Sequence, residues 1–313
     1  MGGIGLRSAT DMALPQFIAS VNSTHDIANL LCDGENDLEY ELARTAWEGL
    51  TYSEPPTDSA ISARTWDAPI SAAKRDKVRG SLLSQLEMAR FVAASTSESA
   101  LLFQGLPSDG EGTRLPDSTF TIAVSLRLAL PVAACSSCSC GLMLDAYGDH
   151  ALVCKKLIGK SARHTEVNAR IHQVHQQAGC PSILEPPGMT RVDGKRPDGA
   201  TILLYERGLP MAWDATIVHT SAQSYRHLTS AHAGEAAAAA VAKMRVKYAA
   251  LDGRVDFRSV GLETLGPFGP SASELLDSIA TRIRAQTGDA GARTRLYRRI
   301  AAALQMGNAV SLD

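Results

Sequence analysis

The apolar residues between positions 161 and 178 recur every three or four residues, which is the spacing of one buried face of an α-helix. Gly179 follows the last of them and is a typical helix stop. The pattern therefore predicts an amphipathic helix over 161–178. Its apolar positions are Val167, Ile171, Val174 and Ala178.

Residues 195–219 have a different pattern, in which a short apolar run, a Gly-Pro turn and an alternating segment predict a β-hairpin. Asp198 stands at its entry and Asp214 on its return strand, 16 residues later (214 − 198). Alternation along a strand places Asp214 on the same face as Ala212 and Thr216, opposite Trp213.

The elements from 161 to 264 follow the order helix, strand, strand, strand, helix, strand, which predicts a sheet flanked by helices. Two further amphipathic helices close the chain. The predicted fold class is α+β. The expected elements are helix 161–178, strand 183–185, hairpin 195–219, helix 231–251, strand 255–264, and helices 273–285 and 292–304.

Residues 1–128 are predicted to be mostly helical, with the strongest helix over 71–94. Apolar residues such as Leu82, Leu86 and Phe91 mark one stripe of that helix. Four cations crowd its first turns, and they indicate a solvated face, with phosphate contact as the alternative. These cations are Lys74, Arg75, Lys77 and Arg79.

The composition of the 313 residues is that of an ordinary globular protein, with 45% hydrophobic and 20% charged residues. The formal net charge of −2 gives no global sign of nucleic-acid affinity, so any such binding has to come from local patches. There is no apolar run of about 20 residues and no secretory pattern at the start, so we expect an intracellular protein without membrane association.

Four of the six cysteines fall between positions 135 and 154, together with His150. In a chain without an export signal, this clustering favours a metal over disulfides. Cys138, Cys140, His150 and Cys154 are our preferred ligands of a closed structural zinc site, with Cys135 as the competitor of Cys140. The cations that follow indicate a nucleic-acid contact or a solvated surface. They are Lys155, Lys156, Lys160 and Arg163.

The carboxylate of Asp214 is costly to bury in an apolar strand unless it has a partner. A divalent cation shared with Asp198 is one such partner. The alternatives are a turn role for Asp198, which lies between proline and glycine, and an ion pair of Asp214 with Arg196 or a lysine.

Taken in order, the motifs of residues 135–266 resemble the C-terminal part of polyproteins from site-specific non-LTR retrotransposons. In that family a CCHC zinc knuckle precedes a restriction-like endonuclease of the PD-(D/E)xK superfamily. The resemblance implies a segment of a longer polyprotein, and no polymerase motif of the aromatic-x-Asp-Asp type is present. The motifs are Cys138-x-Cys140, His150-x-x-x-Cys154, Arg163-His164, Leu184-Glu185-Pro186, Lys195-Arg196-Pro197-Asp198, Trp213-Asp214-Ala215-Thr216, and Lys243 with Lys247-Tyr248.

The activity implied by this resemblance is metal-dependent nicking of double-stranded DNA, which primes reverse transcription. Asp198 and Asp214 correspond to the carboxylates that hold Mg²⁺ or Mn²⁺, and Glu185 or Glu166 to a third. Thr216 stands where the family has its lysine, and Lys247 is our candidate for the missing cation.

The implied partners are double-stranded DNA and the RNA of the element, in the nucleus. Arg163, His164 and Arg196 join the three lysines as expected nucleic-acid contacts. Two alternatives remain, a catalytically inactive zinc-stabilised nucleic-acid-binding module and a protein-interaction domain. The expected domains are 1–128, a helical region downstream of a reverse transcriptase; 129–160, the zinc knuckle; 161–270, the nuclease core; and 271–313, the C-terminal helices.

Overall fold

The computed structural model describes residues 7–31, 37–56, 62–190, 194–206, 208–251 and 253–312. The chain separates into two compact units at Leu83/Ser84. The boundary expected at 128/129 therefore falls inside the second unit, which also contains the expected knuckle, core and C-terminal helices.

The first unit is helical, as predicted, and its core is built on two tryptophans. The rings of Trp47 and Trp66 meet edge to face with centroids 5.0 Å apart, and the Trp47 indole N–H donates to the Trp66 carbonyl at 2.8 Å. Ile18 and Ile70 are buried beside them. The helices are α1 (Ala9–Leu31), α2 (Asp37–Thr51) and α3 (Ala63–Gly80).

The single helix predicted over 71–94 is wrong, because the chain breaks between α3 and α4 (Gln85–Ala94). Ser84 and Glu87 form a capping box: the Ser84 hydroxyl accepts from the Glu87 N–H, and the Glu87 carboxylate accepts from the Ser84 N–H. This motif starts a new helix. Leu83, which lies within the predicted helix, is 94% exposed.

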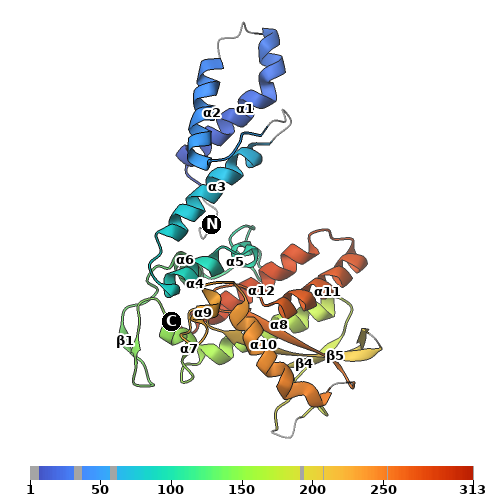
Figure 1. Cartoon of the computed structure of the whole chain (residues 1–313). Coiled ribbons are helices and arrows are strands. Elements are labelled where there is room, and N and C mark those ends of the chain that lie inside the picture. The colour runs from blue at the N-terminus through green and yellow to red at the C-terminus, as the bar shows by residue number, and fades with distance from the viewer. Residues whose placement is uncertain are drawn as a thin grey trace. The chain divides into compact units, whose positions relative to one another are not determined.

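The second unit is organised around a mixed four-stranded sheet in the order β3-β4-β5-β6, with β5 and β6 parallel and the other neighbours antiparallel. Helices cover both faces of the sheet (Figure 1). The order of elements matches the prediction, with a short α9 (Arg226–Thr229) added. The core elements are α8 (Gly159–Gln177), β3 (Ser182–Leu184), β4 (Gly199–Glu206), β5 (Leu209–Val218), α10 (Glu235–Tyr248) and β6 (Asp256–Glu263).

The alternation of β5 divides its side chains between two layers, as the sequence predicted. Met211, Trp213 and Ala215 lie in the main core with the apolar stripe of α8. Ala212 lies on the other side, in a cluster that contains Tyr248 of α10. Helices α11 (Pro270–Thr287) and α12 (Ala292–Ala309) contribute to the main core, so the C-terminal helices are part of this unit.

Further helices of the second unit are α5 (Ser97–Leu101), α6 (Asp117–Leu128), α7 (Asp149–Val153) and the one-turn η1 (Ala249–Leu251). None of the helices in the described ranges is both long enough and apolar enough to cross a bilayer.

His175 on α8 is fully buried, and its ring stacks on Trp213 with centroids 5.1 Å apart. Neither ring nitrogen has a hydrogen-bond partner among the described residues. Burial lowers the pKa of His175 to about 4. An unfolded histidine titrates near pH 6.5, so the unfolded chain binds the proton more readily between these two values.

Stability is therefore expected to fall as the pH drops from about 6.5 to 4, by up to about 3 kcal/mol from this residue. His175→Phe keeps an aromatic ring on Trp213 and should remove that part of the acid sensitivity. Urea unfolding at pH 7 and pH 4.5 measures it, with the exposed His227 changed to Phe as the control. An acid sensitivity equal in both variants would contradict the assignment.

Candidate metal centre and carboxylate pair

The first half of the metal centre is a small hairpin formed by β1 (Ser136–Ser137) and β2 (Met143–Leu144). The Cys138 N–H donates to the Leu142 carbonyl at 2.8 Å, and the Gly141 N–H donates to the Cys138 carbonyl at 2.9 Å. Gly141 has φ +91°, which a residue with a Cβ adopts only with strain. This turn places Cys138 and Cys140 at the tip of the hairpin.

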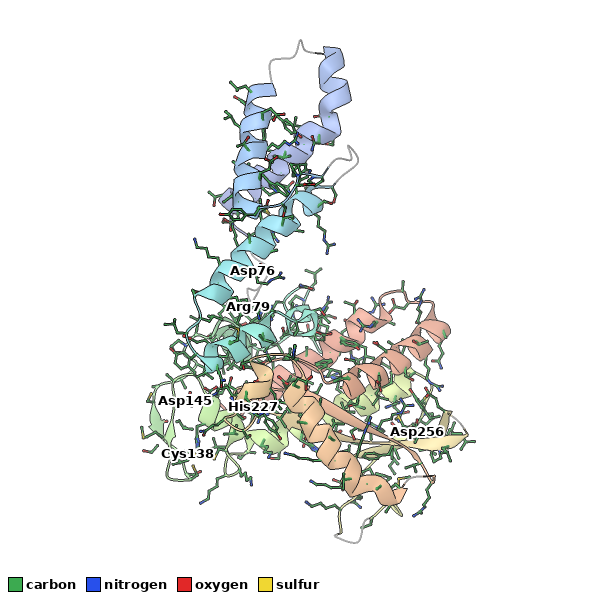
Figure 2. The ribbon with its side chains drawn as sticks, viewed as in Figure 1. Asp76, Arg79, Cys138, Asp145, His227 and Asp256 are labelled. Atoms are coloured by element: carbon green, nitrogen blue, oxygen red, sulfur yellow. The ribbon has the colours of Figure 1, made fainter. Side chains whose placement is uncertain are left out.

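The second half is α7 (Asp149–Val153), which carries His150 and is followed directly by Cys154. The Asp145 carboxylate accepts hydrogen bonds at the N-terminus of α7. Its donors are the backbone N–H groups of Tyr147, Asp149 and His150, at 3.0, 3.1 and 2.7 Å. Cys138 and Asp145 belong to the same small segment of the second unit (Figure 2). The loop between Cys140 and His150 is therefore fixed by the side chain of Asp145, which belongs to that loop.

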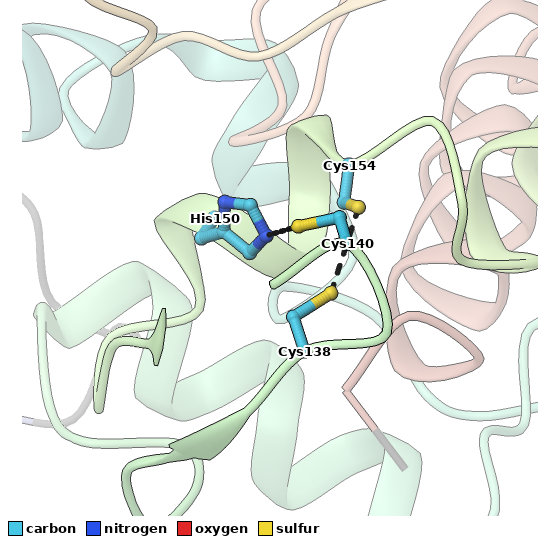
Figure 3. Close-up of side chains that lie close together, drawn as sticks. All are labelled: Cys138, Cys140, His150 and Cys154. Carbon is cyan, nitrogen blue, oxygen red and sulfur yellow. Dashed lines mark hydrogen bonds between the residues drawn. The ribbon is translucent and has the colours of Figure 1, made fainter. Parts of the chain in front are cut away.

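The four side chains converge, as Figure 3 shows. Their donor atoms all lie within 4.8 Å of one another, with 3.6 Å between the sulfurs of Cys138 and Cys154, and 3.2 Å between the Cys140 sulfur and His150 Nε2. A tetrahedral zinc with Zn–S bonds of about 2.3 Å separates its sulfurs by about 3.8 Å. The quartet can therefore hold a metal ion of the structural zinc type.

Cys135 is exposed and lies outside the group, so the preference for Cys140 agrees with the structure. A hydrogen bond from the Cys140 N–H lowers the pKa of Cys138 to about 6. The lowered pKa favours the Cys138 thiolate, which is the form that binds metal.

Asp198 and Asp214 are brought together by the pairing of β4 with β5. The antiparallel register pairs Gly199 with Trp213, which places Asp198 opposite Asp214 at the next position. Asp198 Oδ2 accepts the Ala215 N–H at 2.7 Å, which ties this carboxylate to the strand that carries the other. A Cβ on residue 199 would lie 2.1 Å from the Trp213 ring, so glycine is needed beside Asp198.

The two carboxylates affect each other electrostatically. Burial, together with the negative charge of Asp198, raises the pKa of Asp214 to about 6. The Tyr248 hydroxyl donates to Asp214 Oδ2 and to the Arg196 carbonyl, and it favours the ionised form of Asp214. The positive charge of Lys247, an exposed residue, acts on Asp214 in the same direction.

His164 of α8 reaches Asp198, with 3.0 Å between its Nε2 and Oδ2 of the carboxylate. This hydrogen bond raises the pKa of His164. His164 was predicted to contact nucleic acid, and no pattern in the sequence indicated its contact with Asp198. Tyr248 was likewise named only as part of the motif Lys247-Tyr248, with no contact to Asp214 expected. Both contacts depend on how a helix packs on the sheet, and no local pattern in the sequence indicates that packing.

Among the described residues, neither candidate for a third carboxylate forms a close cluster of ligand atoms with the pair. Glu185 is nevertheless the sheet neighbour of Asp198, because its backbone N–H donates to the Asp198 carbonyl at 2.8 Å. Glu185 is exposed at the end of β3 and forms an ion pair with Arg196. Glu166 is exposed on α8 and makes no hydrogen bond or ion pair with Asp198 or Asp214. Within the described ranges, the Cys/His quartet is the one group of three or more potential ligands with donor atoms this close together.

The prediction that Arg163 contacts nucleic acid is wrong, because this side chain is only 2% exposed. Its guanidinium donates to the Ser311 hydroxyl at 2.7 Å and to the Leu152 carbonyl at 2.6 Å. Arg163 thus joins α8 to α7 and to the C-terminal segment. Its position four residues before Val167, in line with the apolar stripe, was the available signal.

The three lysines predicted with it are exposed: Lys155, Lys156 and Lys160. They extend from the end of the metal quartet to the first turn of α8.

No known protein family matches this sequence, and no curated protein matches it significantly.

Proposed function

We propose that this protein is a metal-dependent DNA endonuclease that uses Asp198 and Asp214 to hold a divalent cation. The observation that carries the proposal is the register of β4 and β5, which sets the two carboxylates opposite each other. A partly buried acidic pair repels itself unless a cation is shared. The pKa of Asp214 is raised mainly by burial and then by the charge of Asp198, so repulsion within the pair contributes to it.

The order and directions of the core elements support a restriction-like fold. In that fold three antiparallel strands precede a helix and a fourth strand, which is the order from β3 to β6 here. The zinc-type quartet directly before the core supports the same retroelement ancestry. We infer that the activity nicks target DNA for reverse transcription.

The surroundings of the pair suggest a role for each neighbour. The Ala215 N–H and His164 orient Asp198, while the Tyr248 hydroxyl orients Asp214. A bound Mg²⁺ or Mn²⁺ would lower the pKa of a coordinated water and stabilise negative charge on the phosphate.

Lys247 would take the place of the missing lysine at position 216, because its charge acts on Asp214. The substrate we propose is double-stranded DNA, approached by the lysines at 155, 156 and 160, which would require a nuclear location.

The second candidate is a zinc-stabilised nucleic-acid-binding module without catalysis, which would bind DNA or the RNA of the element. Thr216 favours it, since the usual cationic side chain is absent from that strand. In that case the fold and the quartet would persist while the carboxylate pair would have lost its chemistry.

Incubation of the full, zinc-loaded chain with supercoiled plasmid tests the proposal. Nicked circles are expected when Mg²⁺ or Mn²⁺ is added and not in a buffer without either cation. If neither cation produces nicking while DNA binding remains sensitive to salt, the nuclease is rejected in favour of the binding module. If the protein neither nicks nor binds DNA at low salt, both proposals fail.

A further inference from the structure

A second polar site lies between the metal quartet and the loop that follows β5. It is a pocket of about 590 Å³. On one side it is lined by His150 and its neighbours on α7, and on the other by the residues from His219 to Arg226. The carboxylate pair does not line it, and the proposed nuclease chemistry uses none of its residues.

The acidic group of this pocket is already neutralised. One oxygen of Asp149 is 3.0 Å from His219 Nε2, and the other accepts from Arg90 at 2.8 Å. The second nitrogen of His219 is 2.7 Å from the Thr264 hydroxyl. Both oxygens of Asp149 and both nitrogens of His219 therefore already have partners, and Arg90 balances the negative charge of Asp149.

Several hydrogen-bond donors of the pocket have no partner among the described residues. Ser221 is 1% exposed, and its hydroxyl has no hydrogen-bond partner among the described residues. Arg226 directs Nε and Nη2 to the Ser221 carbonyl, at 3.3 and 3.1 Å, which leaves Nη1 without a partner in the described part of the chain. The backbone N–H groups of Gln223 and Ser224 likewise donate to no described residue.

An arginine, a hydroxyl and consecutive backbone N–H groups that line one pocket have the chemistry of a typical anion site. We propose that this pocket binds a phosphate group, with Arg226 and Ser221 as its principal donors. Two sources share this chemistry, a phosphodiester of a nucleic-acid strand and a free phosphate ion.

The nucleic-acid source is consistent with the position of the pocket. Ser221 follows Asp214 by seven residues (221 − 214), so their Cα atoms lie at most about 25 Å apart. DNA rises 3.4 Å per nucleotide of a strand, so a strand bound at the carboxylate pair could reach the pocket within about eight nucleotides. Phosphate binding itself does not require the carboxylate pair to be catalytic.

Titration of the full chain with inorganic phosphate at constant ionic strength tests the site, followed by the amide resonances of residues 221–226. Saturable shifts of these resonances are expected. Arg226→Gln should weaken phosphate binding about tenfold, the loss of one charge-assisted hydrogen bond. The matched control is Arg284→Gln, which removes the same charge from an exposed site on α11 and should leave phosphate affinity unchanged.

Ser221→Ala tests the site with a variant that should fold normally. It removes a buried hydroxyl that has no partner among the described residues. It should weaken phosphate binding about threefold without lowering the melting temperature. Absence of shifts in the wild type, or equal phosphate affinity in wild type, Arg226→Gln and Ser221→Ala, would overturn the proposal.

The affinity of the same variants for a DNA duplex identifies the source. If Arg226→Gln also weakens DNA binding and reduces its salt dependence relative to Arg284→Gln, the phosphate belongs to the nucleic acid. If DNA binding is the same in both variants while phosphate binding is lost only in Arg226→Gln, the pocket takes free phosphate. Because phosphate binding is measured without cleavage, a failed nuclease proposal would leave this result intact.

Discussion

Asp214→Asn is expected to abolish metal-dependent nicking and, at the same time, to make the metal-free protein more stable. The amide cannot neutralise a divalent cation, so the nicking rate should fall by at least about a thousandfold. In the folded chain the carboxyl of Asp214 titrates near pH 6 instead of 3.8. The folded state thus binds this proton more tightly than the unfolded state, and stability falls as the pH rises from about 3.8 to 6.

At neutral pH the ionised Asp214 lowers the free energy of unfolding by the full amount, and an asparagine removes this loss. We expect a gain of about 2 kcal/mol at pH 7 in metal-free buffer, after allowance for partial solvent screening. The same titration should make Mg²⁺ bind about tenfold more weakly at pH 5 than at pH 7, because a proton competes for Asp214. Urea unfolding and Mg²⁺ titration measure the two effects.

Two further variants sharpen the interpretation. Asp198→Asn should also lose nicking, whereas Glu166→Gln should retain it, since Glu166 is exposed and makes no hydrogen bond or ion pair with Asp198 or Asp214. If Asp214→Asn lost both activity and stability, the residue would be structural. If Glu166→Gln were as inactive as Asp198→Asn, the helical carboxylate suggested by the family resemblance would belong to the site after all.

The periodicity of the chain was sufficient to predict the core, because burial on one or two faces leaves a direct record in the sequence. Val167 and Ile171 mark the buried face of α8, and the alternation around Trp213 marks β5. The break between α3 and α4 was missed, because apolar spacing alone does not weigh the capping box at Ser84 and Glu87. Polar residues that cap a helix N-terminus can break the chain into two helices even where the apolar pattern is continuous.

The sequence predicted which site residues come together only where those residues are close to one another along the chain. The metal quartet depends on a short loop and was predicted correctly as a group. The contacts of His164 with Asp198 and of Tyr248 with Asp214 join helices to a sheet across long sequence separations. Arg163 shows the converse case, in which a charged side chain is buried and its two terminal nitrogens donate to acceptors from other segments.

Cys154→Ser is expected to remove the bound metal and to unfold the segment around it. The wild type should contain one zinc per chain, and the variant none, by metal analysis of the purified protein. Residues 136–154 have only two two-residue strands and a five-residue helix, so they bury little apolar surface of their own. Structural zinc contributes about 10–16 kcal/mol in small zinc domains, which is far more than such a segment can supply.

Loss of zinc should spread beyond the ligands, because Asp149 of α7 contacts Arg90 of α4 and His219 after β5. Hydrogen exchange should therefore show lost protection first in 136–154 and then around these contacts. Cys135→Ser is the matched control: its side chain is exposed outside the quartet, so zinc content and protection should stay at wild-type levels. Zinc retained in Cys140→Ser but lost in Cys135→Ser would show that the hairpin tip pairs differently when metal is bound.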